Sequence, residues 1–273
     1  EDGVRYESVF ALAESRGLNV ARMRPADPGF GDFLSARRPD LMITADYRYL
    51  LPLEVISRAS RGAINLHPSL LPKYRGRAPL NWAILHGESE LGLTAHCIDA
   101  GADTGDIVAQ QRFTLEPDED VGDALRKLYP LYERMAAHVV ALAKVGAWPR
   151  VPQDHAAATV FPARRPEDGR IDWRQPAERI HRLIRAVAAP YPGAFSTIAG
   201  HKVTIWRAEV ESQDTGEPPG TVLREEQGES FRVACGRGTL RATKWSVNDQ
   251  VNGPLPSAIK ACFDSVPAPA ADA

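Results

Sequence analysis

Cysteine is scarce in this chain of 273 residues, which contains only Cys97, Cys235 and Cys262. The three lie far apart and are odd in number. They therefore form neither the framework of a disulfide-rich secreted protein nor the paired spacing of a zinc site. Because free thiols persist in a reducing compartment, we expect a cytoplasmic protein.

Long apolar runs and an excess of basic charge are also missing. No apolar stretch approaches the roughly 20 residues that span a bilayer, and no secretory signal begins at Glu1, so we expect no membrane partner. The chain holds 33 Lys and Arg against 35 Asp and Glu. Its net charge of -2 gives no electrostatic reason to expect a polyanion partner.

Several common ligand motifs are missing as well. The sequence contains no G-x-G-x-x-G and no P-loop, so neither dinucleotide binding nor nucleotide hydrolysis is indicated. His86, His96 and His138 do not fall at metal-ligand spacing with carboxylates or thiols. We therefore expect no metal site.

Strand and helix patterns alternate over the first half of the chain. Hydrophobic residues make up 44% of the sequence and charged residues 25%, which is enough for an ordinary core. Periodicity predicts strands at 18–20, 41–45, 62–66, 92–98 and 107–113, and helices at 6–16, 33–38, 52–59, 79–86 and 118–145. This alternation favours an α/β fold with a Rossmann-like, doubly wound, mostly parallel sheet.

The pattern changes near residue 150. Residues 151–170 are polar and rich in proline, and an amphipathic helix is predicted at 176–187. Short alternating segments follow, separated by turn signals, at 195–198, 202–206, 221–223, 230–235 and 239–243. Such spacing is typical of a small β-barrel, so we expect two domains, residues 1–165 and 166–273.

Asn65 and His67 form the first candidate site. They lie two residues apart on a predicted strand, so both side chains point to one face, and Pro68 ends that strand. Buried polar groups often need only a local hydrogen-bond partner, which is the simplest interpretation of either residue alone. Together at a strand end, an amide and an imidazole can stabilise a developing oxyanion or move a proton.

Three acidic residues share the loop between the predicted strands 92–98 and 107–113. Asp103 could orient a histidine or accept a proton, but it could equally serve only as a turn residue. Asp99 and Asp106 compete for the same role, and their spacing does not rank the three.

Lys73, Arg75 and Arg77 form a basic loop after the strand that carries Asn65. Arginine offers two hydrogen-bond donors in a fork that suits phosphate or carboxylate. The loop is therefore either an anion-recognition element or a solvated basic surface.

The polar residues named above carry a resemblance to a known family. Residues 65–72, NLHPSLLP, resemble the Asn-x-His signature of the formyltransferases that depend on 10-formyltetrahydrofolate, and Asp103 falls where that family places its catalytic aspartate. The resemblance extends from Tyr6 to about Thr243. It implies the formyltransferase fold followed by an OB-like β domain, with 10-formyltetrahydrofolate as co-substrate.

The resemblance also implies a role for each catalytic residue. A primary amine of the substrate would attack the formyl carbon on N10 of the folate. Asn65 and His67 would donate hydrogen bonds to the oxyanion, while Asp103 would orient His67 and help carry the amine proton to N10.

Binding residues follow from the same resemblance. The pterin would lie along Tyr47, Leu50 and Leu51, with the loop that begins at Asp99 closing over it. Arg77 and Arg164 are the candidates for the phosphates of the acceptor substrate.

Two branches of the family offer different acceptors. Residues 72–82, PKYRGRAPLNW, are similar to the polymyxin-resistance branch, which formylates UDP-4-amino-4-deoxy-L-arabinose, whereas residues 103–106 are closer to methionyl-tRNA formyltransferase. Between Glu167 and Ala273 the chain has 13 Lys and Arg against 14 Asp and Glu, a net charge of -1. A tRNA-binding domain should be basic, so a nucleotide-linked amino sugar is the expected acceptor and tRNA the alternative.

The family normally begins with a strand, a helix and a strand ahead of Tyr6, a unit of about 30 residues that this sequence does not contain. We therefore expect a truncated sequence of the transferase alone, without a dehydrogenase half. A second alternative is a non-catalytic domain that binds folate or a nucleotide. The resemblance is also compatible with a homodimer.

Overall fold

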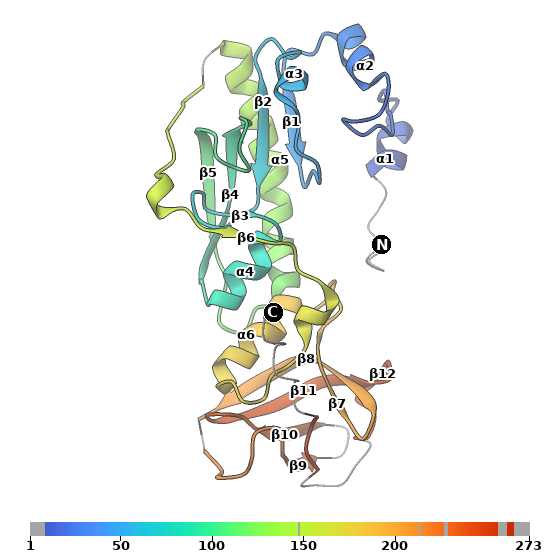
Figure 1. Ribbon diagram of the computed structural model, residues 1–273, viewed down its shortest axis with the longest axis vertical. Coiled ribbons are helices and arrows are strands. Elements are labelled where there is room, and N and C mark those ends of the chain that lie inside the picture. The colour runs from blue at the N-terminus through green and yellow to red at the C-terminus, as the bar shows by residue number, and fades with distance from the viewer. Residues whose placement is uncertain (1–8, 147, 213, 227–228, 256–260, 265–273) are drawn as a thin grey trace, which may run out of the picture. The chain divides into compact units, whose positions relative to one another are not determined.

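The computed structural model describes residues 9–146, 148–212, 214–226, 229–255 and 261–264 (Figure 1). The chain divides into two compact units. Unit 1 comprises Glu1–Pro79, Leu91–Phe113 and Arg126–Phe161, and unit 2 comprises Leu80–Glu90, Thr114–Leu125 and Pro162–Ala273. Segments of the two units alternate along the sequence. The prediction of two consecutive domains, residues 1–165 and 166–273, stays a prediction.

A four-stranded sheet forms the centre of unit 1 (Figure 1). Its strand order is β1 (Met42–Ala45), β2 (Ala63–His67), β4 (Glu90–Cys97) and β5 (Ile107–Thr114). β1 and β2 pair in parallel, and β2 and β4 pair antiparallel. The predicted α/β class is confirmed, and the sheet contains both parallel and antiparallel pairs.

The two central strands, β2 and β4, are buried because most of their side chains are apolar. Ile64, Leu66 and Leu93 have at most 2% of their surface exposed, and Ala95 has none. Strands covered on both faces need near-continuous apolar sequence, and β2 and β4 have it. Polar side chains in these strands therefore stand out, because each must find a partner inside the protein.

Helices and short elements complete the first 170 residues. They are α1 (Val9–Ser15), α2 (Phe30–Arg37), α3 (Leu53–Ile56), α4 (Pro79–His86), α5 (Val121–Val145), the 3₁₀ turns η1 (His155–Ala157) and η2 (Pro166–Gly169), and the parallel pair β3 (Arg75–Gly76) and β6 (Val160–Phe161). The long helix α5 buries one stripe of side chains at helical spacing, as its sequence predicts. That stripe is Val121, Ala124, Leu128, Leu131, Met135 and Val139.

The predicted strand at residues 18–20 is wrong. This segment has no regular structure, and Leu18 leaves 62% of its surface exposed. A strand needs a neighbour for its backbone hydrogen bonds, and within the described residues the sheet begins at β1. The first predicted helix is confirmed over Val9–Ser15, and residues 6–8 lie outside the described residues.

Unit 2 contains a curled antiparallel sheet (Figure 1). Its elements are α6 (Ala177–Val187), β7 (Ala194–Ile198), β8 (His201–Glu211), β9 (Val222–Glu226), β10 (Ser230–Ala234), β11 (Thr239–Val247) and β12 (Gln250–Val251). The strand order is β7-β8-β11-β10-β9, with β12 beside β11. α6 contacts β8 and buries Ile180, Ile184 and Val187, as its amphipathic pattern predicts. This arrangement agrees with the predicted small β domain.

The described part of the chain contains no helix that is both long enough and apolar enough to cross a membrane.

Candidate active site

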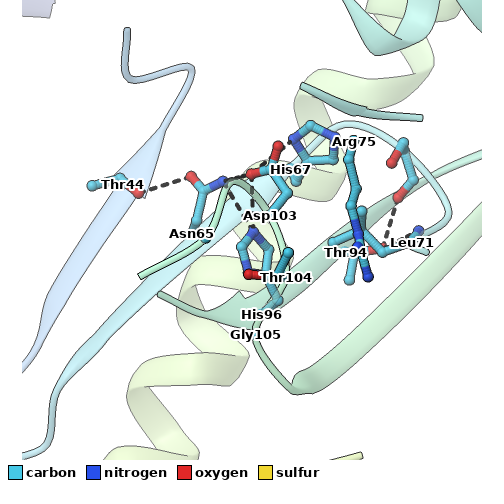
Figure 2. Close-up of polar contacts among 12 residues, drawn as sticks. Thr44, Asn65, His67, Leu71, Arg75, Thr94, His96, Asp103, Thr104 and Gly105 are labelled. Carbon is cyan, nitrogen blue, oxygen red and sulfur yellow. Dashed lines mark hydrogen bonds and ion pairs between the residues drawn. The ribbon is translucent and has the colours of Figure 1, made fainter. Parts of the chain in front are cut away.

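Asn65 lies on β2 with its amide orientation fixed from the neighbouring strand. The parallel register of β1 and β2 places Thr44 opposite Asn65. The Thr44 hydroxyl donates to Asn65 Oδ1 at 2.8 Å, so the Nδ2 group points the other way, toward Asp103 (Figure 2). Asn65 Nδ2 lies 3.3 Å from Asp103 Oδ1.

Asp103 reaches this position from the loop between β4 and β5. Its backbone has a φ of 55°, in the left-handed region that aspartate tolerates better than most residues. Its second carboxylate oxygen, Oδ2, accepts a hydrogen bond from the backbone N–H of Gly76 at 2.9 Å. Asp103 therefore joins the amide on β2 to the loop that begins after His67.

His67 ends β2 and has only 4% of its surface exposed. Its Nε2 lies 2.8 Å from the carbonyl oxygen of Tyr74. Because a carbonyl oxygen only accepts, Nε2 carries the hydrogen. The other ring nitrogen, Nδ1, faces Asp103 Oδ1 at 3.7 Å. Asn65, His67 and Asp103 thus lie together, as the family resemblance implies.

The structure adds a fourth polar residue that the sequence reasoning missed. His96 on β4 is 2% exposed, and its Nε2 lies 3.2 Å from Asn65 Nδ2 and 3.4 Å from Asp103 Oδ1. The antiparallel register pairs His96 directly with Asn65. The available signal was a histidine inside an otherwise apolar strand, but its partner depends on a pairing that the sequence does not reveal.

Burial and hydrogen bonding act in opposite directions on Asp103. Burial alone raises its pKa, but the hydrogen bond with His96, the charge of His67 and the Gly76 N–H outweigh burial and lower the pKa to about 2. Burial also lowers the pKa of His67, against the attraction of Asp103. Near neutral pH the site therefore holds an ionised carboxylate beside a neutral His67 imidazole.

These contacts define what the site can do chemically. The carboxylate can accept a proton, and the amide and imidazole groups can donate hydrogen bonds to an oxyanion. In this structure the N–H groups of Asn65 and the Nε2–H of His67 are already bonded within the protein. A substrate oxygen must therefore exchange with one of these internal acceptors.

Asp99 and Asp106, the two rivals of Asp103, have other contacts. Asp99 Oδ1 accepts hydrogen bonds from the Gly101 N–H at 3.1 Å and from the Thr104 hydroxyl at 2.6 Å, which closes the loop that presents Asp103. The backbone carbonyl of Asp106 accepts from the N–H of Cys97. The geometry therefore favours Asp103 as the acid of the site, while the folate role of Asp99 stays a prediction.

The expectation of an exposed basic loop is wrong for Arg75. Its side chain is 5% exposed, and its Nε and Nη2 donate to Gln153 Oε1 at 3.2 and 2.7 Å. Gln153 Nε2 in turn donates to the backbone oxygens of Asp103 and Gly105 at 2.9 and 2.6 Å. Arg75 is thus part of the support of the Asp103 loop, not an anion-binding surface.

The predicted folate segment follows β1 and is largely exposed. Tyr47 lies 40% exposed and meets Tyr49 edge-on at 5.7 Å between ring centroids, while Leu50 is 73% exposed and Leu51 half-buried. Arg77, an exposed residue, donates from Nη2 to the backbone oxygen of Arg48 at 2.7 Å. Arg77 therefore ties the loop after β2 to this segment.

Arg164 lies in unit 2, and its contacts given below are with other residues of that unit. Its guanidinium carbon is 4.8 Å from the ring centroid of Trp82, and Nη2 donates to the Asp168 backbone oxygen. Its Nε is buried without a hydrogen-bond partner among the described residues. The predicted phosphate role of Arg164 stays a prediction.

The described ranges contain no group of three or more His, Cys, Asp or Glu residues that could hold a metal ion.

Both parts of the chain match known protein families. Residues 5–140 match the family described as formyl transferase, and residues 164–251 match the formyl transferase C-terminal domain. The chain belongs to the formyl transferase family. The resemblance to this family that the sequence analysis found is confirmed. The two matched regions correspond to the α/β fold and the curled β-sheet described above.

Solved structures share this fold at low sequence identity. HypX from Aquifex aeolicus in complex with tetrahydrofolic acid is 22% identical with a TM-score of 0.63, over 86% of this chain and 41% of that one. An N-formyltransferase from Helicobacter canadensis, in complex with folinic acid and dTDP-3-aminofucose, is 20% identical with a TM-score of 0.68, over 88% and 83%. Methionyl-tRNA formyltransferase from Clostridium thermocellum is 22% identical with a TM-score of 0.57, over 76% and 87%. This formyl transferase chain thus spans less than half the length of HypX.

Proposed function

We propose that this chain transfers a formyl group from 10-formyltetrahydrofolate to the primary amine of a nucleotide-linked amino sugar. The observation that carries the proposal is the position of the Asp103 carboxylate, held 3.3 Å from the amide of Asn65 and 3.7 Å from the ring of His67. This set supplies a proton acceptor and hydrogen-bond donors, and the attacking nucleophile belongs to the substrate.

The chemical steps follow from these groups. The substrate amine adds to the formyl carbon, and the new oxyanion takes an N–H from Asn65 or His67 in place of an internal acceptor. One such donor is typically worth about 3 kcal/mol of the barrier. Asp103 accepts a proton from the ammonium nitrogen and passes it to N10 as the bond between carbon and N10 breaks.

Folate as the formyl donor is supported by two lines. The HypX and Helicobacter canadensis structures contain tetrahydrofolic acid and folinic acid. In this chain the exposed side chains of Tyr47 and Leu50, with the half-buried Leu51, offer the apolar surface that a pterin ring needs.

The choice of acceptor rests on charge and on one neighbour. The Helicobacter canadensis enzyme was solved with dTDP-3-aminofucose. Residues 167–273 of this chain carry 13 basic against 14 acidic residues, which is unfavourable for a tRNA backbone. The likeness to the Clostridium thermocellum enzyme keeps charged initiator tRNA as the second candidate.

The test is direct. The protein is incubated with 10-formyltetrahydrofolate and, separately, with UDP-linked amino sugars, dTDP-linked amino sugars and charged initiator tRNA, and release of tetrahydrofolate is followed. We expect turnover with a nucleotide-linked amino sugar and its loss in Asp103→Ala, with folate binding retained in that variant. Turnover with tRNA alone would replace the acceptor, and silence with all acceptors while folate still binds would favour the non-catalytic alternative.

A further inference from the structure

His96 contacts both Asn65 and Asp103, but it has no role in the formyl-transfer steps given above. It sits on β4 between apolar neighbours, and its ring is turned toward the strand that carries Asn65 (Figure 2). A histidine that is 98% buried is costly unless its nitrogens are bonded, and both nitrogens of His96 have partners.

The partner of Nδ1 fixes the hydrogen on this ring. Nδ1 lies 2.9 Å from the carbonyl oxygen of Cys97, which can only accept, so Nδ1 carries the hydrogen. In the neutral ring Nε2 then has only a lone pair. It can accept from Asn65 Nδ2 at 3.2 Å. It bonds to the Asp103 carboxylate only when Nε2 also carries a hydrogen, which is the form that lowers the pKa of Asp103.

A charged ring reverses this preference. With a second hydrogen on Nε2, His96 donates to Asp103 Oδ1 at 3.4 Å and no longer accepts from Asn65. One N–H of the Asn65 amide then loses its internal acceptor. The hydrogen on Nε2 thus decides which of the two groups, the Asn65 amide or the Asp103 carboxylate, His96 bonds.

We propose that His96 is a positioning residue for formyl transfer, which holds the Asn65 amide and the Asp103 carboxylate in their reactive arrangement. The inference rests on the proposed function. Because only 2% of the surface of His96 is exposed, the proposal has it act through these two groups and not on the substrate.

The test compares three variants with the wild type: His96→Leu, His96→Gln and, as a matched control, His138→Gln at an exposed position on α5. A hydrogen bond to a charged group is worth enough to change a rate by about 10- to 100-fold. We expect His96→Leu to lower kcat by that factor with KM for folate unchanged. Glutamine can accept or donate at the same place, so His96→Gln should recover part of kcat, and His138→Gln should match the wild type.

The pH profile separates positioning from a merely structural effect. The charged groups around the site are Asp103 from the β4–β5 loop, His67 from β2, and Asp46, which follows β1 and acts on His67. Because His96 lowers the pKa of Asp103, the acidic limb of kcat should move to higher pH in His96→Leu and remain in place in His138→Gln. A folded His96→Leu protein with wild-type kcat and an unmoved limb would overturn the proposal.

A second measurement keeps this inference separate from the reaction itself. In histidine-labelled protein, Asn65→Ala should shift the ¹⁵N resonance of His96 Nε2 and leave the resonances of His138 unchanged. A wild type that binds folate but transfers no formyl group would contradict the proposed function. An unshifted His96 resonance would contradict the contact on which His96 is assigned its role.

Discussion

Gln153 donates a hydrogen bond from Nε2 to the backbone oxygen of Asp103 at 2.9 Å, and so supports the loop that carries the carboxylate. The same amide group also donates to the Gly105 oxygen at 2.6 Å. Its oxygen accepts from the buried guanidinium of Arg75. The position of Asp103 is therefore set through its backbone as well as through its side chain, and this has consequences that can be measured.

Replacing Gln153 should destabilise the protein and the site together. Gln153→Leu removes the donor to two backbone oxygens and one of the two acceptors of the Arg75 guanidinium, which keeps only His155 Nδ1. Each unsatisfied buried group costs about 1–3 kcal/mol. We expect the free energy of unfolding in urea to fall by about 2–4 kcal/mol. Gln153→Glu keeps an acceptor for Arg75 but loses the donors to the loop, so it should unfold less readily than Gln153→Leu yet also lose formyl transfer. Gln153→Leu with wild-type stability would contradict this role.

Gly105 makes a second, independent test of the same loop. A Cβ at this position would lie 2.0 Å from the backbone oxygen of Cys97, so backbone must move. We expect Gly105→Ala to lower the melting temperature and kcat, with a cost of about 1–3 kcal/mol. The control is Gly31→Ala in α2, where the Cβ meets only the movable end of Arg58 at 3.0 Å and alanine favours the helix. Equal melting temperatures for the two variants would show that the loop tolerates displacement.

Arg77 should affect binding more than stability. It is exposed, and its Nη2 reaches the backbone oxygen of Arg48 in the predicted folate segment at 2.7 Å. Arg77→Ala should therefore raise KM for 10-formyltetrahydrofolate and for the nucleotide-linked acceptor, with the free energy of unfolding changed by less than about 0.5 kcal/mol. Steady-state kinetics with each substrate varied in turn measures both constants. Unchanged KM values for both substrates would remove Arg77 from the binding residues.

The sequence predicts part of this site for local reasons and leaves the rest open for non-local ones. Asn65 and His67 share a face because side chains alternate along a strand, and Pro68 marks the strand end. Neither inference needs the rest of the fold. The spacing of the three acidic residues in the next loop does not show which side chain faces Asn65, because this depends on how the loop turns. Only the family resemblance selected Asp103.

The long-range contacts could not be predicted in this way. His96 contacts Asn65 because β2 and β4 pair antiparallel with these two residues in register. The sequence of either strand alone does not predict which distant strand it pairs with or in what register. Arg75 appears as one charge of a basic loop, but Gln153, distant in sequence, draws it into the interior. The prediction of a strand at residues 18–20 was wrong for a related reason. An extended segment without a neighbouring strand cannot form the backbone hydrogen bonds of a sheet.

Acid should weaken the fold through Asp103. Its pKa is about 2 in the folded protein and 3.8 for the free side chain, so folding favours the ionised form. That stabilisation is present above pH 3.8 and is lost as the pH falls toward 2. The difference amounts to about 2 kcal/mol. We expect the free energy of unfolding of the wild type to fall more steeply than that of Asp103→Asn over this range. Parallel curves for the two proteins would contradict the lowered pKa.

His67 should produce a separate pH dependence closer to neutrality, and with a different cause. Burial lowers its pKa below 6.5, so between the folded and the unfolded pKa the unfolded chain binds a proton that the folded protein does not. Stability from the neutral ring is thus present above pH 6.5 and lost as the pH falls below that value. The melting temperature of His67→Gln should depend less on pH than that of the wild type, while His138→Gln should follow the wild type. Proton NMR can follow the ring directly. A His67 resonance that titrates at or above pH 6.5 would mean that the attraction of Asp103 outweighs burial.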